Sequence, residues 1–399
     1  MISVFSEFPL DAALIRGIED LKYTEATPIQ REAIPVALAG RDVFASAPTG
    51  SGKTAAFGVP LLQKLLERRA GQGAALILTP TRELAQQVSN HLQQLAKHTK
   101  LRITPVYGGV GMRPQIKAMR RGTDVIVATP GRLMDLMRQG EVRLDSISMW
   151  ILDEADRMLD MGFLPDVKRI AAKLPADRQT LCFSATLDGA VAKLAREFLH
   201  DPARIDLAPQ KPAATVAQSV YEVETEKKTD LLVDLLKDGR IYNAIVFTRT
   251  KSRAERVAGA LARHNIDAER IHGDRSQAQR TRALEAFKKG RYRVLVATDV
   301  ASRGIDIEAL GHVINYDVPN EPTDYIHRIG RTGRAQKTGD AMTFVSRDEA
   351  RSFARIEAAM GKRLERTEHG FMEPAGFRPA PDASRVGRRS FSRRRRSGR

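Results

Sequence analysis

The stretch Met149-Trp150-Ile151-Leu152-Asp153-Glu154-Ala155-Asp156 decides the fold, because four apolar residues run directly into adjacent carboxylates. A short, continuous apolar run is typical of a strand buried on both faces, as in a parallel sheet. Open α/β sheets bind ligands at the carboxyl ends of their strands. The acids therefore mark either a ligand-binding edge or a surface turn, where Asp is common. These eight residues alone leave both interpretations open.

A glycine-rich loop favours the ligand-binding interpretation. A predicted strand at Asp42–Ala45 leads into Ala47-Pro48-Thr49-Gly50-Ser51-Gly52-Lys53-Thr54, and a predicted helix covers Ala55–Arg68. Strand, loop and helix in this order predict a P-loop, although Ala47 stands where the general pattern has Gly. Backbone N–H groups of such a loop wrap a phosphate, helped by the helix N-terminus. Lys53 is then expected at the β- and γ-phosphates, and the Thr54 hydroxyl at Mg²⁺.

Apolar runs alternate with helical patterns along most of the chain, which predicts βαβ units and two parallel-sheet domains of the α/β class. We expect a first domain over 1–206, a linker over 207–217, a second domain over 218–365 and a disordered basic tail over 366–399. The predicted strands besides Asp42–Ala45 are Ala74–Leu78, Ile103–Val106, Val125–Ala128, Met149–Leu152, Leu181–Phe183, Ala244–Phe247, Ala268–Ile271, Val294–Ala297, His312–Ile314 and Ala341–Val345.

The charge balance predicts a polyanionic partner, with nucleic acid first. The formal net charge is +17, and the segment from Pro374 onward carries nine arginines and one acid, Asp382. The tail therefore accounts for +8, and +9 belongs to the rest of the chain. The Arg-rich end either binds phosphate backbones without sequence preference or serves as a flexible solubility tail.

The cysteine and hydropathy patterns point to a reducing compartment away from the membrane. Cys182 is the only cysteine, so no intramolecular disulfide forms. No apolar run approaches the ~18 residues that span a bilayer. The N-terminal residues lack the basic start and apolar core of a signal peptide. We expect a cytoplasmic protein with no membrane partner.

Arg328, Arg331 and Arg334 are spaced by three, so on a helix they share one face. Such a face suits a phosphoryl group, and a solvated basic helix is the alternative. A phosphoryl-transfer site needs a phosphate cradle, Mg²⁺, an oriented water and positive charge at the γ-phosphate. Asp153 is expected to hold Mg²⁺ and Glu154 to orient or deprotonate the water. Since the arginines lie in the second domain, the site is expected to be complete only when the domains close.

With these motifs in place, the chain resembles the DEAD-box RNA helicases of superfamily 2. Asp153-Glu154-Ala155-Asp156 is the tetrapeptide that names the family, and matching motifs extend from Phe5 to Arg334. The phrases Leu152–Phe163 and Val294–Ile307 and the basic tail resemble the bacterial SrmB and RhlE types. The resemblance implies two tandem RecA-like domains and an RNA-dependent ATPase that uses ATP and Mg²⁺. It further implies local unwinding of short RNA duplexes or remodelling of RNA–protein complexes, in ribosome assembly or RNA turnover, with proteins of those pathways as possible partners.

The resemblance also assigns roles to single residues. It implies that Tyr23 stacks on adenine and Gln30 hydrogen-bonds its edge, that Asp306 touches the ribose, and that His327 contacts the γ-phosphate network. Arg331 and Arg334 are implied as arginine fingers, and Ser184 and Thr186 as the link between hydrolysis and RNA binding. The implied RNA contacts are Arg82, Gly109, Thr129, Gly131 and Arg132 in the first domain and Arg249, Gly273 and Thr298 in the second.

Three residues depart from the family pattern without removing a reacting group. Lys22 and Ala26 replace Gly and Pro near the adenine site, and Ser302 replaces Ala before Arg303. The first two leave nucleotide selectivity less certain. Two other functions stay open: a DNA translocase, against which the resemblance argues through Asp153–Asp156 and Gln30, and an ATP-gated RNA clamp.

Overall fold

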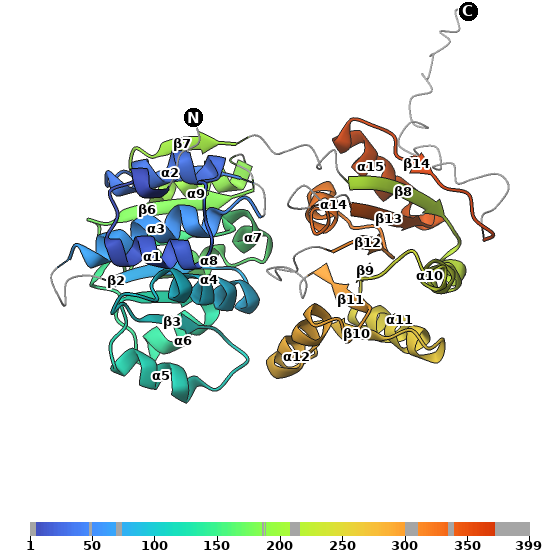
Figure 1. Ribbon diagram of the computed structural model, residues 1–399, viewed down its shortest axis with the longest axis horizontal. Helices are drawn as coiled ribbons and strands as arrows, with labels where there is room; N and C mark the ends of the chain where they lie inside the picture. Colours follow the sequence, from blue (N-terminus) through green and yellow to red (C-terminus); the bar gives the residue numbers. More distant parts are fainter. Residues whose placement is uncertain are drawn as a thin grey trace, which may run out of the picture.

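The computed structural model shows two α/β units that follow one another along the chain (Figure 1). Each contains a seven-stranded sheet in which every described strand pair is parallel. The predicted fold class is therefore confirmed. The structure describes residues 5–47, 50–68, 74–185, 187, 189–207, 216–299, 310–333 and 339–371.

The first unit orders its strands β3-β4-β2-β5-β6-β1-β7, so that β5 lies at the centre of the sheet. The strand that carries the acids thus has neighbours on both sides. The elements of this unit are η1 (Phe5–Glu7), α1 (Ala12–Asp20), α2 (Pro28–Leu38), β1 (Val43–Ser46), α3 (Lys53–Leu66), β2 (Ala74–Leu78), α4 (Arg82–Leu95), β3 (Ile103–Val106), α5 (Met112–Arg120), β4 (Val125–Ala128), α6 (Pro130–Arg138), β5 (Ile147–Leu152), α7 (Ala155–Asp160), α8 (Leu164–Ala171), β6 (Gln179–Ser184), α9 (Gly189–Phe198) and β7 (Ala203–Asp206).

The second unit has the strand order β10-β11-β9-β12-β13-β8-β14. The carboxyl ends of its central strands β9, β12 and β13 are neighbours at one edge, which matters for the charges described below. Its elements are β8 (Val216–Glu222), η2 (Thr225–Lys227), α10 (Lys228–Lys237), β9 (Ala244–Thr248), α11 (Lys251–Arg263), β10 (Ala268–Ile271), α12 (Gln277–Lys288), β11 (Val294–Thr298), β12 (His312–Asn315), α14 (Pro322–Ile329), β13 (Gly339–Val345), η3 (Arg347–Glu349), α15 (Ala350–Met360) and β14 (Glu365–Arg366).

Strand β5 is buried on both faces, as its apolar run predicts. Met149 and Ile151 belong to one hydrophobic cluster, whereas Trp150 and Leu152 belong to the cluster on the opposite face. Successive side chains of a strand point to opposite faces, so two helical layers are needed to cover this one. This double burial fixes the direction in which the strand delivers Asp153 to the sheet edge.

Three strands are missing from the sequence-based prediction: β7 and β14 at sheet edges, and β8 between β13 and β14. In β7 only Ile205 is buried, and both residues of β14 are exposed, so neither shows the apolar run of a central strand. Strand β8 begins at Val216, inside the expected linker. Residues 366–371, expected in the disordered tail, instead continue the second unit: the Thr367 N–H donates to the Val220 carbonyl at 2.8 Å, and Phe371 packs against the core.

Among the helices of the described ranges, none combines the length and the apolar character that a bilayer crossing requires.

The close approach of α1 to the end of α4 depends on a glycine. A Cβ at Gly17 of α1 would lie 2.0 Å from the Leu95 carbonyl oxygen at the end of α4. Gly17→Ala is therefore expected to lower the free energy of unfolding by about 1–3 kcal/mol, as overpacking does, in urea denaturation.

Gly259→Ala is the matched control. Gly259 lies inside α11, where the nearest atom to an added Cβ is Arg263 Nη1 at 3.8 Å. This substitution should raise stability by up to ~1 kcal/mol through helix propensity. Equal stability of Gly17→Ala and the native chain would show that the α1–α4 contact is not close.

Candidate active site and nucleic-acid interface

The P-loop leads from β1 into α3 through left-handed glycines. Gly50 and Gly52 have φ values of 83° and 92°, which β-carbons disfavour. The Lys53 Nζ donates to the Ala47 carbonyl at 2.7 Å, inside the loop, and Lys53 is 9% exposed. The Lys53 side chain thus folds back from the N-terminus of α3 onto the start of the loop. This geometry suits a phosphate chain.

Gln30 ties the first turn of α2 to the P-loop. Its Oε1 accepts from the Thr27 N–H at 2.8 Å, and its Nε2 donates to the Gly52 carbonyl at 3.1 Å. Gln30 is buried. Tyr23 lies near the same end of the unit, stacked on Phe5 with ring centroids 6.1 Å apart. Its hydroxyl is 3.1 Å from His91 Nε2.

Asp153 is buried at the end of β5, with an exposed fraction of 3%. Its Oδ1 has no hydrogen-bond partner among the described residues. Burial, followed by the charge of Glu154, raises the pKa of Asp153 to about 7. A buried carboxylate oxygen without a protein donor is suited to a hard cation such as Mg²⁺.

Glu154 has the left-handed φ of 54° and begins α7. Burial alone would raise its pKa, but the charges of Arg157, Lys53 and Arg331 outweigh burial and hold the pKa below its ordinary value. Arg157 Nη1 donates to Glu154 Oε2 at 2.6 Å. Glu154 is therefore ionised, as a group that accepts a proton must be. The role of Arg157 has no signal in the local sequence pattern.

Asp156 joins the acidic strand end to the end of the neighbouring strand β6. Its Oδ2 accepts from the Ala185 N–H at 3.3 Å. Ser184, immediately before, accepts from the Ala47 N–H at 3.2 Å through its carbonyl. The Ser46 hydroxyl donates to the Ala185 carbonyl at 3.1 Å. The P-loop strand, the β6 end and the acids thus form one connected edge.

Two side chains of the second unit reach this edge electrostatically. Arg331 is 6% exposed and lowers the pKa of Glu154, which belongs to the first unit. Burial and then the charge of Arg157 lower the pKa of His327 to about 4, so its ring is neutral at physiological pH. The structure therefore brings His327 and Arg331 to the predicted acids.

The predicted helical face of arginines is wrong in its geometry. Helix α14 ends at Ile329, so Arg331 lies beyond it. Arg328 is buried and forms a bidentate pair with Asp299, both bonds being 2.6 Å long. Arg328 therefore holds the second unit together, and the helical spacing of three did not reveal this.

Part of the predicted nucleic-acid surface is assembled in the first unit. Gly109 has φ 80°, and a Cβ there would lie 1.9 Å from Arg82 Nη1. Arg132 Nη2 donates to the Val110 carbonyl at 3.2 Å. Two arginines thus lie against one glycine-containing loop. Thr129 and Gly131 begin α6 beside them, and nothing lies within 4 Å of a Cβ built on Gly131.

The corresponding residues of the second unit follow neighbouring strands. Arg249 is exposed directly after β9, and Thr298 ends β11 in register with Thr248 of β9. Gly273 lies beside Lys251, whose Cε would be 3.3 Å from an added Cβ. These three predicted positions therefore share one edge of the second sheet.

The two units also touch directly through Glu83, the neighbour of Arg82. Glu83 Oε1 accepts from Gln277 Nε2 at 2.8 Å and from Arg280 Nη2 at 3.0 Å. The side chains of Glu83 and Arg280 are each only 11% exposed. None of these three residues was identified from the sequence. Pro48, Thr49, Thr186, Asp306 and Arg334 lie outside the described residues.

Comparison with known proteins agrees with this arrangement. The DEAD/DEAH box helicase family model matches residues 27–194, and the helicase conserved C-terminal domain model matches residues 227–336. The chain is 42% identical over 375 residues to the DEAD-box ATP-dependent RNA helicase CshA of Geobacillus kaustophilus, covering 94% of this chain and 80% of the relative. CshA of Bacillus subtilis is also 42% identical, covering 94% of this chain and 76% of the relative.

Solved structures give the same result. Saccharomyces cerevisiae Dbp5 bound to RNA and ADP BeF3 superposes with a TM-score of 0.82 at 32% identity, covering 91% of this chain and 95% of that one. Mss116p bound to ssRNA and AMP-PNP superposes with a TM-score of 0.84 at 29% identity, covering 92% of this chain and 80% of that one.

The P-loop, the paired acids and the two parallel sheets define an ATPase built from two RecA-like units. The chain belongs to the DEAD-box ATP-dependent RNA helicases. The comparisons support the family, whereas the SrmB or RhlE type expected from the sequence is not singled out by relatives that carry the name CshA.

The raised pKa of Asp153 predicts a stability change. This acid has its ordinary pKa of 3.8 in the unfolded chain and about 7 in the folded one, so the folded state loses stability as pH rises between these values. Asp153→Asn should raise the free energy of unfolding of the nucleotide-free protein by on the order of 2 kcal/mol at pH 8, and the gain should vanish near pH 4.

Urea denaturation at several pH values measures this effect. Asp145→Asn is the control, since the Asp145 side chain is 66% exposed and its loss should change stability by less than about 0.5 kcal/mol. A stability of Asp153→Asn at or below the native value at pH 8 would contradict the assignment of an unfavourable buried charge.

Proposed function

We propose that the chain is an RNA-dependent ATPase that closes its two units on one RNA strand and so unwinds short duplexes or remodels RNA–protein complexes. The observation that carries the proposal is that the second unit touches the first and brings a cation close enough to the hydrolytic edge to act on it electrostatically. Arg331 lowers the pKa of Glu154, and Glu83 binds Gln277 and Arg280 across the boundary. The complexes of Dbp5 with RNA and ADP BeF3 and of Mss116p with ssRNA and AMP-PNP support it.

The nucleotide is held by the P-loop and its neighbours. Backbone N–H groups from Gly50 to Thr54 and the Lys53 ammonium bind the phosphates, while Gln30 and Tyr23 bind the adenine. ATP binding releases Lys53 from the Ala47 carbonyl, where it rests in this structure. Gln30 keeps its bond to Gly52 and thus links base recognition to loop shape. The ribose contact of Asp306 rests on the family resemblance alone.

Thr54 and Asp153 would hold Mg²⁺, largely through water, and the bare Asp153 Oδ1 fits that task. When bound, this ion neutralises charge on the β- and γ-phosphates. The Glu154 carboxylate, ionised because cations surround it, takes the proton of the attacking water. Arg331 and Arg334 place positive charge at the γ-phosphate, and neutral His327 contributes hydrogen bonding there.

RNA lies along the edge that both units share. Arg82, Gly109, Thr129, Gly131 and Arg132 bind the strand from the first unit, and Arg249, Gly273 and Thr298 bind it from the second. Ser184 and Thr186 couple this surface to hydrolysis, and the bond from the Ala185 N–H to Asp156 supports that coupling. Contacts to phosphates and 2′-hydroxyls give preference for RNA over DNA.

The biological setting stays a prediction. Ribosome assembly or RNA turnover, partner proteins from those pathways, the SrmB or RhlE type and a cytoplasmic location all rest on the sequence. Sequencing of RNA cross-linked to the protein in cells would distinguish ribosome assembly from RNA turnover. Ribosomal RNA would support assembly, and scattered messenger RNA would support turnover.

Glu154→Gln tests the hydrolytic assignment. The amide keeps an oxygen for Arg157 but cannot take a proton, so RNA-stimulated ATP turnover should fall by roughly 10²–10⁴-fold. ATP and RNA should stay bound, as fluorescence anisotropy with labelled RNA measures. Turnover at the native rate would exclude Glu154 as the base. In the native protein, equal stimulation by single-stranded DNA and RNA would favour a DNA translocase instead.

Gly109→Ala tests the nucleic-acid surface. The added Cβ would overlap Arg82 Nη1, so Arg82 must leave its position and RNA affinity should fall by about 10-fold. Gly140→Ala is the matched control, because Gly140 has a similar φ of 70° with nothing within 4 Å of an added Cβ. The control should lose comparable stability but keep RNA affinity. Equal RNA affinities in the two variants would remove Arg82 from the interface.

A further inference from the structure

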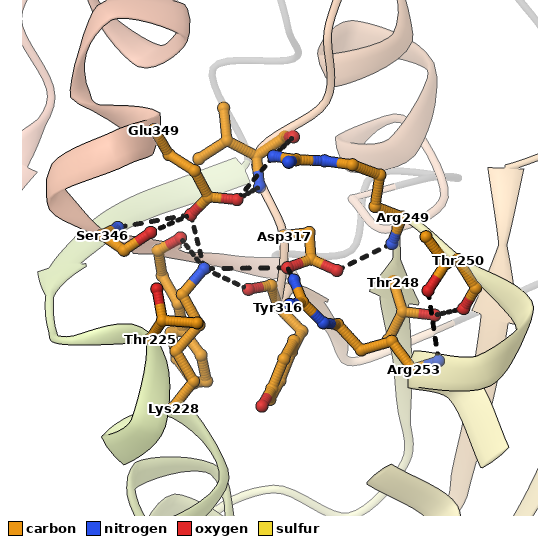
Figure 2. Close-up of polar contacts among 12 residues, drawn as sticks. Thr225, Lys228, Thr248, Arg249, Thr250, Arg253, Tyr316, Asp317, Ser346 and Glu349 are labelled. Atoms are coloured by element: carbon orange, nitrogen blue, oxygen red, sulfur yellow. Dashed lines mark hydrogen bonds and ion pairs between the residues drawn. The ribbon is translucent and has the colours of Figure 1, made fainter. Parts of the chain in front are cut away.

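A cluster of charged residues lies inside the second unit, at the carboxyl ends of β9, β12 and β13. Figure 2 shows its members, which come from separate segments of the chain. We call it the Lys228 network and define it as Lys228, Arg249, Arg253, Asp317 and Glu349. Only Arg249 among these residues was assigned a role from the sequence.

Lys228 is the innermost cation of the network. It begins α10 and is 1% exposed. Its Nζ bonds Glu349 Oε2, donates to the Tyr316 carbonyl at 2.8 Å and lies 3.8 Å from Asp317 Oδ1. A buried ammonium is retained only where such partners compensate its lost hydration. Lys228 therefore fixes both carboxylates in place.

Those carboxylates in turn hold Arg249 at two points. Asp317 Oδ2 accepts from the Arg249 backbone N–H at 2.7 Å, and Glu349 Oε1 accepts from its Nη2 at 2.7 Å (Figure 2). Nη2 also donates to the Val318 carbonyl at 3.3 Å. Both side-chain bonds thus use one nitrogen, and Nε and Nη1 have no bond to another described residue. Nε and Nη1 lie on different edges of the planar guanidinium, and either one alone can donate to an oxyanion while Nη2 stays anchored.

The charges of the network do not cancel. The network contains three cations and two anions. Arg253 Nη1 donates to Asp317 Oδ1 at 2.5 Å, so both oxygens of Asp317 accept hydrogen bonds. The carboxylates are at most 3% exposed, whereas 41% of the Arg249 side chain is exposed. The surplus positive charge is therefore displayed at the surface through Arg249. One phosphate group would make the network neutral.

We propose that Glu349, Asp317 and Lys228 are positioning residues that hold Arg249 in the orientation in which it binds an RNA backbone phosphate. The inference rests on the proposed function, since it deepens the role given there to Arg249. A free arginine loses rotamer freedom when it binds, whereas an anchored one has lost it during folding. The network thus lowers the entropic cost of capturing RNA at the second unit.

The decisive variant is the double substitution Lys228→Met with Glu349→Gln. It removes one positive and one negative charge, so the net charge of the network is unchanged, and the charged bond from Arg249 Nη2 to Glu349 is replaced by the weaker bond that a neutral amide oxygen accepts. RNA affinity should fall roughly 2- to 10-fold, which corresponds to one side chain that must be ordered on binding. Turnover at saturating RNA should remain at the native rate, because the hydrolytic residues are untouched.

Arg249→Ala completes a double-mutant cycle. The probe is a fluorescein-labelled single-stranded poly(U) oligonucleotide, titrated in the presence of a non-hydrolysable ATP analogue. In the Arg249→Ala background, Lys228→Met with Glu349→Gln should cause no further loss of affinity. Independent losses that add, or native affinity of the double variant, would overturn the positioning role. Native affinity of Arg249→Ala would instead overturn the RNA contact assigned to Arg249 under the proposed function.

Two further variants guard against misfolding and nonspecific effects. Arg249→Lys changes an exposed residue and keeps its charge, but an ammonium group cannot bind Glu349 and a phosphate through separate nitrogens. The loss of RNA-binding free energy in Arg249→Lys should therefore be at least half of the loss in Arg249→Ala. Native affinity of Arg249→Lys would overturn the proposal even if the double variant failed to fold. Asp348→Asn removes a neighbouring carboxylate that bonds Ser346 and Thr225, and RNA affinity should not change.

Discussion

Burial of two adjacent carboxylates at the end of an apolar strand is the constraint on which the active site depends. Strand β5 has apolar clusters on both faces, so Asp153 and Glu154 are delivered to a dry sheet edge with little choice of direction. The pKa of Asp153 rises, and its Oδ1 has no partner among the described residues. The charges of Arg157, Lys53 and Arg331 outweigh burial and lower the pKa of Glu154. One of these cations belongs to the second unit. The second unit therefore contributes part of the positive charge that lowers the pKa of Glu154.

In the second unit, the buried charges are paired with one another. Lys228, Asp317 and Glu349 satisfy one another inside the unit, and the arginines at the rim bring the total to one positive charge. Replacing such a network with apolar residues often leaves stability unchanged or higher, so stability alone does not explain it. What the charges provide is a fixed position for an exposed guanidinium at a strand end. In both units, burial thus holds charged side chains at the edge where the strands end.

The sequence predicted those parts of the site that depend on local patterns. The P-loop, the central strands and the acids after Leu152 each lie within one short segment, where apolar runs and glycine spacing carry the signal. Arg328 shows where local patterns fail, because its spacing from Arg331 suggested a shared helical face although α14 ends between them. Its partner Asp299 lies in a distant segment, as do Asp156 and Ala185 from each other. Pairings of this kind depend on strand order, which periodicity does not determine. The outer strands β7 and β14 were missed because they lack a buried apolar run.

The position of Glu83 connects closure of the units with the nucleic-acid surface. Glu83 and Arg82 are consecutive in the first turn of α4, so an element that contacts α12 of the second unit also presents an arginine toward Gly109. The Glu83–Arg280 pair is largely desolvated, and such pairs gain little net free energy because the lost hydration offsets their attraction. Closure therefore cannot rest on this contact alone. Ligands that bind both units must supply the remaining free energy, and on the proposed function RNA bound at Arg82 supplies it beside Glu83. By linkage, the free energy by which bound RNA favours closure equals the free energy by which closure strengthens RNA binding. On the proposed function, a weak direct contact leaves the equilibrium between open and closed forms under the control of ATP and RNA.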